Sequence, residues 1–134
     1  MQQDDNKANL LFVDDEKRVL TSMRAMFRRA YNVSLANSGL EALEVLERKT
    51  IDVIVSDQRM PGMTGVEVLK TFKDNAPDAM RILLTGYADQ EAIAASINEG
   101  EVFRYLTKPC PPDLLKQTIV LAVEAVKGPQ LQAK

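Results

Sequence analysis

Histidine is absent from the 134 residues of the chain, and cysteine occurs once, as Cys110. The lack of histidine excludes a Ser–His–Asp triad, a histidine-ligated metal site and a histidine phosphocarrier within the chain. One cysteine excludes an internal disulfide framework and agrees with a reducing compartment. Any chemistry in this chain must therefore use carboxylates, lysine, hydroxyl groups, Cys110 or a metal ion.

An excess of one charge sign and long apolar runs are also missing. The chain has 17 Lys and Arg against 19 Asp and Glu, a net charge of −2, so it has no electrostatic footprint for sequence-independent binding to nucleic acid or anionic lipid. No apolar stretch approaches the roughly 20 residues that span a bilayer, and residues 1–7 form a polar tail rather than a signal peptide. We therefore expect a cytoplasmic protein that binds neither membranes nor, directly, nucleic acid.

The composition that is present is typical of a globular protein. The apolar fraction is 46% and the charged fraction is 27%, and the length fits one domain with a real core. We expect this domain to span residues 8–127. Residues 128–134 are then a C-terminal tail or a truncated linker.

Short apolar runs alternate with amphipathic segments along the whole domain. The expected strands cover residues 9–16, 31–36, 51–57, 80–86 and 102–109. The expected helices cover residues 16–30, 37–49, 64–77, 89–100 and 111–127, with Asn37 or Ser38 as a cap of the second. Five strands that alternate with five helices predict a doubly wound α/β domain with a parallel sheet.

Polar side chains stand where four of these strands end: Asp14 and Asp15, Asp57, Thr85, and Lys108. The carboxyl ends of parallel strands share one edge of the sheet, so we expect these groups to meet there. Three clustered carboxylates require a hard cation, and Mg²⁺ or Mn²⁺ fits oxygen ligands. Lys108 and Thr85 add the positive charge and the hydroxyl donor that an acyl phosphate on a carboxylate needs. Alone, Asp14 and Asp15 equally fit caps of the following helix.

Four motifs follow the successive strands in order: "VDDE" at 13–16, "SDQRMPGMTG" at 56–65, "LLTG" at 83–86 and "YLTKP" at 105–109. With them the chain resembles the receiver domain of two-component response regulators over about residues 8–127. It is similar to receivers that precede transcription activators or HD-type phosphodiesterase outputs. The resemblance implies a flavodoxin-like fold with strand order 2-1-3-4-5 and a phosphorylation-controlled signalling switch.

The resemblance also implies roles for the acids. Asp57 would accept a phosphoryl group from a histidine kinase or phosphotransfer protein. Asp14, Asp15 and Asp57 would bind Mg²⁺, Asp14 mostly through water, and the backbone carbonyl of Arg59 would complete the protein ligands. The domain would catalyse only its own phosphorylation and dephosphorylation and would have no external substrate.

The remaining family roles concern the phosphoryl group and the switch. Lys108 would contact the phosphoryl group, and its bond to Pro109 would be cis. Thr85 would turn toward the phosphoryl oxygens, with Gly86 keeping the site open, and Tyr105 would move from exposed to buried. Tyr105 also fits an ordinary core aromatic. The surface that changes would be the fourth helix, the fifth strand and the fifth helix.

Three features allow two interpretations each. Arg59 and Tyr87, two residues after Asp57 and Thr85, either hinder the attacking water and lengthen the phosphoryl lifetime or are ordinary surface residues. Cys110 is a redox sensor or, as we favour, a loop residue. The helix at 111–127 has apolar residues on more than one face, which indicates a homodimer or output-domain contact or else a deeply buried helix.

Three other functions compete with a receiver. A small phosphatase of the haloacid-dehalogenase type also forms an aspartyl phosphate, but it uses an Asp-x-Asp pattern where this chain has the adjacent pair Asp14 and Asp15. A flavodoxin-like cofactor binder needs a glycine-rich phosphate loop after the first strand, which this sequence lacks. A receiver-shaped interaction module that works without phosphate is the third alternative.

Overall fold

The structure is a computed structural model, which describes residues 6–86 and 102–128. Its strands are β1 (Asn9–Val13), β2 (Asn32–Ala36), β3 (Val53–Asp57), β4 (Met80–Gly86) and β5 (Arg104–Lys108). Its helices in the described part are α1 (Lys17–Phe27), α2 (Gly39–Arg48), α3 (Gly65–Asn75) and α5 (Pro112–Lys127). The strands form one parallel sheet in the order β2-β1-β3-β4-β5, which confirms the predicted sheet and strand order.

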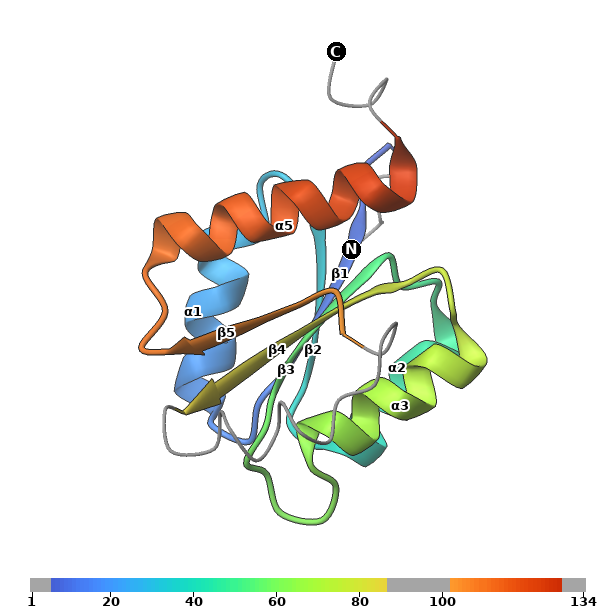
Figure 1. The fold of residues 1–134 in the computed structure, drawn as a ribbon, viewed down its shortest axis with the longest axis vertical. Helices are drawn as coiled ribbons and strands as arrows, with labels where there is room; N and C mark the ends of the chain where they lie inside the picture. Colours follow the sequence, from blue (N-terminus) through green and yellow to red (C-terminus); the bar gives the residue numbers. More distant parts are fainter. Residues whose placement is uncertain (1–5, 87–101, 129–134) are drawn as a thin grey trace.

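Helices cover both faces of this sheet (Figure 1). α1 and α5 lie on one face and α2 and α3 on the other. Each face has its own apolar core, one around Phe12, Phe27 and Ile119 and the other around Ile54 and Phe72. Four of the five expected helices are therefore confirmed. The expected helix at residues 89–100 lies outside the described residues.

The central strand is buried along its whole length. All five residues of β3 are buried, as expected for a parallel strand with helices on both sides. Two of the helices that flank it begin at side-chain caps. The hydroxyl of Ser38 accepts a hydrogen bond from the Glu41 N–H, so Ser38 rather than Asn37 caps α2. Thr64 and Glu67 form a reciprocal capping box at the start of α3.

α5 packs on the sheet through one face only. Leu115, Ile119 and Val123 are buried, whereas Leu114 and Leu121 are 44% and 48% exposed. The interpretation of this segment as a deeply buried helix is therefore wrong, and its outer face exposes apolar side chains beside polar ones such as Lys116 and Gln117. In the described part of the chain, no helix has the length and apolar character needed to cross a bilayer.

Candidate functional site

The carboxyl edge of the sheet brings three predicted acids together. Asp14 and Asp15 directly follow β1, and Asp57 is the last residue of β3. One carboxylate oxygen of each lies within 4.8 Å of the others, with Asp14 and Asp57 buried and Asp15 exposed. Because β1 and β3 are neighbours in the sheet, the strand ends alone place these groups side by side.

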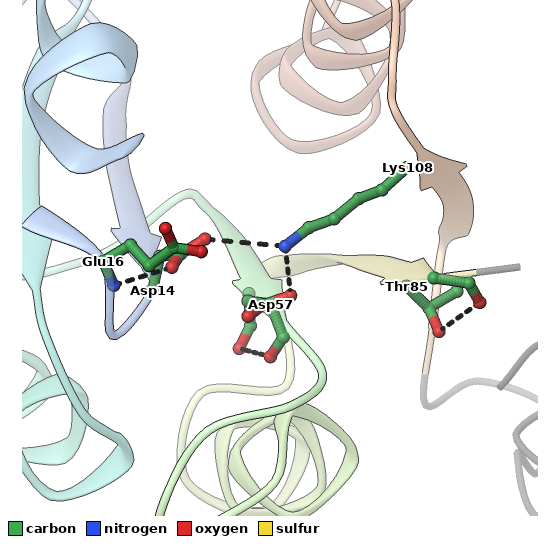
Figure 2. A network of polar contacts seen from close by, with 7 residues as sticks. Asp14, Glu16, Asp57, Thr85 and Lys108 are labelled. Carbon is green, nitrogen blue, oxygen red and sulfur yellow. Dashed lines mark hydrogen bonds and ion pairs between the residues drawn. The ribbon is translucent and has the colours of Figure 1, made fainter. Parts of the chain in front are cut away.

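Lys108, the last residue of β5, reaches this cluster from two strands away (Figure 2). Its Nζ lies 2.6 Å from Asp57 Oδ1 and 3.8 Å from Asp14 Oδ2. The bond between Lys108 and Pro109 is cis, as the family resemblance implied. The ammonium therefore bonds to Asp57 directly and lies close to Asp14.

Asp14 does not cap α1. Its Oδ1 accepts a hydrogen bond from the N–H of Glu16, the residue before the helix, and α1 begins at Lys17 without a side-chain cap. The alternative interpretation of Asp14 and Asp15 as caps of this helix is therefore wrong. Both acids instead lie beside Asp57.

Burial and crowding disfavour the charged form of Asp14. Desolvation has the largest effect and raises the pKa of Asp14, and the charges of Asp57 and Asp15 raise it further. The hydrogen bond from the Glu16 N–H and the charge of Lys108 lower it, but the net shift is upward. For Lys108, burial is the largest single effect and lowers its pKa. The hydrogen bond and charge of Asp57, with Asp14 and Glu16, outweigh burial and raise the pKa. The cluster is therefore short of positive charge.

This donor set fits a divalent cation. When the three carboxylates are ionised, one ammonium leaves two negative charges uncompensated in a partly buried site. All the ligand atoms are oxygens, which suit Mg²⁺ or Mn²⁺ rather than a thiolate-binding metal. The charge, the ligand type and the spacing of the oxygens thus agree on a hard divalent ion.

Thr85 and Gly86 stand at the end of β4, between the ends of β3 and β5. The Thr85 side chain is fully buried, and its Oγ1 donates a hydrogen bond to the Gly86 carbonyl at 3.4 Å. A side chain added at Gly86 would meet no described atom within 4 Å, so the space beside this position is open. Tyr105 on β5 is 40% exposed, which contradicts the alternative of a core aromatic.

The side chain of Arg59 is exposed in the loop that follows β3. Tyr87, its proposed counterpart after Thr85, lies outside the described residues.

Cys110 is partly buried between β5 and α5, and its thiol donates a hydrogen bond to the Pro111 carbonyl. Burial raises the pKa of this thiol, which favours the loop residue over the redox sensor.

Two residues of the site were missed by sequence reasoning. Gly65, the first residue of α3, packs against the backbone of Asp57, because a Cβ at this position would overlap the Asp57 carbonyl oxygen. A glycine directly after the cap Thr64, where glycine is not needed for capping, was the available signal. The second residue is Gln58, whose side chain bonds to the Val66 N–H; no local pattern indicates this contact.

Comparison with known proteins identifies the family. The response regulator receiver domain matches residues 10–120. The chain belongs to this family. Among curated proteins, the chain is similar to the hydrogenase transcriptional regulatory protein HoxA from Cupriavidus necator, with 42% identity over 121 residues, 90% of this chain and 25% of HoxA. The chain thus spans about a quarter of the length of the curated relatives it matches.

Solved receiver structures match this chain over most of its length. The signal receiver domain of an HD domain-containing protein from Pseudomonas fluorescens Pf-5 is 30% identical with a TM-score of 0.82, and 92% of each chain is covered. The response regulator TrrA from Thermotoga maritima, solved in complex with Mg²⁺ and beryllofluoride, is 26% identical with a TM-score of 0.75, covering 86% of this chain and 98% of TrrA. These matches support both the fold and a divalent cation at the acidic cluster.

Membership of the receiver family decides between the competing functions. A receiver is a phosphorylation-controlled signalling switch rather than a metabolic enzyme, and receivers work with histidine kinases and output domains. The phosphatase and the flavodoxin-like cofactor binder are therefore set aside. The acids, Lys108 and Thr85 are the polar groups that the described structure places at the carboxyl edge of the sheet.

Proposed function

We propose that Asp57 is the phosphoryl acceptor of this receiver and that its donor is a phosphohistidine on a kinase or phosphotransfer protein. The observation that supports this most directly is the contact of buried Asp57 with the Lys108 ammonium at 2.6 Å, beside two further acids. A carboxylate oxygen of Asp57 attacks phosphorus, the P–N bond of the donor breaks, and its electron pair leaves with the imidazole.

Mg²⁺, or Mn²⁺ in its place, is the proposed cofactor. Asp14, Asp15, Asp57 and the backbone carbonyl of Arg59 would hold it. When bound, the ion offsets the charge of the acids and of the phosphoryl oxygens. Burial of Asp14, which raises its pKa, makes the charged cluster costly without a cation and so favours binding.

Lys108 and Thr85 are the proposed phosphoryl-binding side chains. The Lys108 ammonium, now paired with Asp57, would contact a phosphoryl oxygen once Asp57 carries the acyl phosphate. The Thr85 hydroxyl would exchange the long hydrogen bond to the Gly86 carbonyl for a second phosphoryl oxygen. Gly86 leaves the open space that this requires. Tyr105, which is 40% exposed, would then turn inward as the readout of the switch.

The proposed output surface is formed by the helix expected at residues 89–100, by β5 and by α5. Exposed apolar side chains on α5, among them Leu114 and Leu121, support it as a contact surface for a second copy or an output domain. We take residues 8–127 as the receiver and residues 128–134 as a tail or linker, in a cytoplasmic regulator. Equal sedimentation of the protein with and without beryllofluoride would contradict phosphorylation-dependent dimerisation.

We also propose that Arg59 and Tyr87 hinder the attacking water during hydrolysis of the phosphoryl group. The exposed side chain of Arg59, two residues after Asp57, supports this role. Removal of both side chains by Arg59→Ala and Tyr87→Ala should shorten the lifetime of the phosphorylated form. The decay of the phosphorylated mass over time measures it, and slower decay in the double variant would contradict the role.

The test of the function is intact mass after incubation with a small phosphodonor, acetyl phosphate, and Mg²⁺. We expect one added phosphoryl group, which disappears when the metal is chelated or when Asp57→Asn is used. Labelling of Asp57→Asn would place the acceptor elsewhere. If the wild type takes no label, beryllofluoride separates the cases: a change at Thr85 and Tyr105 indicates a receiver that accepts only from its kinase, and no change indicates a module that works without phosphate.

A further inference from the structure

Gln58 directly follows Asp57 and is bonded to two neighbouring elements. Its N–H donates a hydrogen bond to the Leu84 carbonyl on β4 at 3.0 Å. Its own carbonyl accepts from the Gly65 N–H at 3.0 Å, and its Oε1 accepts from the Val66 N–H at 2.9 Å, both in the first turn of α3. One residue thus connects the end of β3 to β4 and to α3.

These bonds complete the N-terminus of α3. The first N–H groups of a helix have no partner within the helix and need acceptors from outside it. Gln58 supplies two of them, for Gly65 and Val66, and the hydroxyl of Thr64 supplies the third, for Glu67. A glutamine six residues before the cap therefore does part of the capping.

The same bonds close residues 59–64 into a loop, because Gln58 on one side of it is bonded to Gly65 and Val66 on the other. Within it, Gly62 turns the chain at a φ of 85°, and Met60 is buried. The loop begins with Arg59, whose backbone carbonyl is the proposed fourth protein ligand of the metal. Gly65 holds the other end against the Asp57 backbone, because a Cβ there would overlap the Asp57 carbonyl oxygen.

We propose that Gln58 is a positioning residue for the metal site: its side-chain bond to the Val66 N–H holds the loop that carries the Arg59 carbonyl. This inference rests on the proposed function, which makes that carbonyl a ligand. Without Oε1 the Val66 N–H loses its acceptor, the loop is held by main-chain bonds alone, and the carbonyl must be ordered when the metal binds. Residues behind metal ligands typically change metal affinity by about tenfold or more.

The experiment is a Mg²⁺ titration of the whole chain without phosphodonor, followed by backbone amide chemical shifts. Gln58→Met keeps the length of the side chain and removes the acceptor, and we expect its Mg²⁺ affinity to fall by about tenfold. Gln58→Glu restores an acceptor for the Val66 N–H. We expect it to recover most of the affinity at about 0.5 M salt, where its added charge is screened.

Ser38→Ala is the matched control, because it removes a side-chain cap of similar kind, to the Glu41 N–H of α2, and leaves the bonds of Gln58 in place. It should lose stability and keep the wild-type affinity for Mg²⁺. A purely structural role of Gln58 predicts that Gln58→Met behaves like this control. Folded Gln58→Met with an affinity within about twofold of the wild type would therefore overturn the proposal.

A second measurement uses only the wild type and so does not depend on the folding of a variant. Hydrogen exchange at the Val66 amide should slow when Mg²⁺ is added, because metal binding and the Gln58 bond order the same loop. Unchanged exchange would overturn the proposal. A wild type that binds Mg²⁺ but neither takes a phosphoryl group nor responds to beryllofluoride would contradict the proposed function and leave the role of Gln58 to be judged by affinity alone.

Discussion

Two aspartates stand at opposite ends of β3, and each pairs with a lysine from the C-terminal part of the chain. At the carboxyl end, Asp57 contacts Lys108 at 2.6 Å. At the amino end, Asp52 Oδ2 lies 3.5 Å from the Nζ of Lys127, the last residue of α5, and accepts the N–H of Asn9 at 2.7 Å. Both aspartates are buried, so each depends on its partners.

The difference lies in what surrounds each pair. The charge of Asp52 is satisfied by a backbone N–H and an ammonium, and Asn9 extends the network through its side-chain bonds to the Thr50 carbonyl and to Asn32. Asp57 shares its ammonium with Asp14 and lies beside Asp15. The charge at the amino end of the strand is therefore balanced within the folded chain. The carboxyl end lacks positive charge, which agrees with the proposed binding of a cation there.

Replacing each aspartate by its amide gives the sharpest test of this contrast. Asp57→Asn should abolish phosphorylation. It should not lower the free energy of unfolding of the metal-free protein, because the loss of charge repulsion with Asp14 and Asp15 offsets the loss of the ion pair with Lys108. Asp52→Asn should leave phosphorylation intact and cost about 2 kcal/mol, since it removes a charged acceptor and a partly buried ion pair. Intact mass and urea unfolding measure the two effects.

The reverse pattern would break the comparison. Loss of labelling in Asp52→Asn with its fold intact would mean that the amino end of the sheet also serves the phosphoryl chemistry. A large loss of stability in Asp57→Asn would mean that the carboxyl end is as complete as the amino end.

Gly65 and Gly86 sharpen the contrast within the carboxyl end. Gly65→Ala should cost about 2 kcal/mol, because its Cβ would overlap the Asp57 carbonyl oxygen and lie 2.7 Å from a Leu83 methyl group. Gly86→Ala should change the free energy of unfolding by less than about 0.5 kcal/mol, because its Cβ enters open space. Thermal and urea unfolding of the two variants would be compared.

Equal costs for the two glycines would contradict the close packing of α3 against Asp57. The expected outcome would mean that the close packing of Gly65 against the Asp57 backbone stabilises the carboxyl end of the sheet. The charged side chains of the site would then serve binding rather than stability.

The smallest effect is a pH dependence of Asp14→Asn. Burial raises the pKa of Asp14 in the folded protein, so the folded state binds the proton more tightly than the unfolded state. Its charged form therefore costs stability at neutral pH, and this cost disappears as the pH falls through the folded pKa toward the unfolded value. Without metal, Asp14→Asn should be more stable than the wild type at neutral pH, and the difference should shrink on acidification.

Urea unfolding of both proteins at a series of pH values measures this difference. The contributions of other titrating groups are common to the two proteins and cancel in it. Saturating Mg²⁺ should reverse its sign at neutral pH, because the ion stabilises the wild type through Asp14. A difference that grows on acidification would contradict the raised pKa of Asp14.

The order of elements and the edge where the acids meet were determined by the sequence alone. The reason is physical: apolar runs such as residues 53–55 are long enough only for strands, and parallel strands place Asp57, Thr85 and Lys108 at one edge whatever the details of packing. The caps were less certain, because Asn37 and Ser38 are both good caps and only the backbone geometry chooses Ser38.

Contacts between residues far apart in sequence were decided only by the tertiary structure. The pairing of Asp52 with Lys127 and Asn9 requires the end of α5 and the starts of β1 and β3 to meet, and a charged residue at a strand start looks the same in sequence with or without partners. The bond from Gln58 to Val66 depends on the path of the loop between them. The exposed face of α5 likewise depended on packing, since a helix with apolar residues on several faces fits either a buried position or a contact surface until its neighbours are placed.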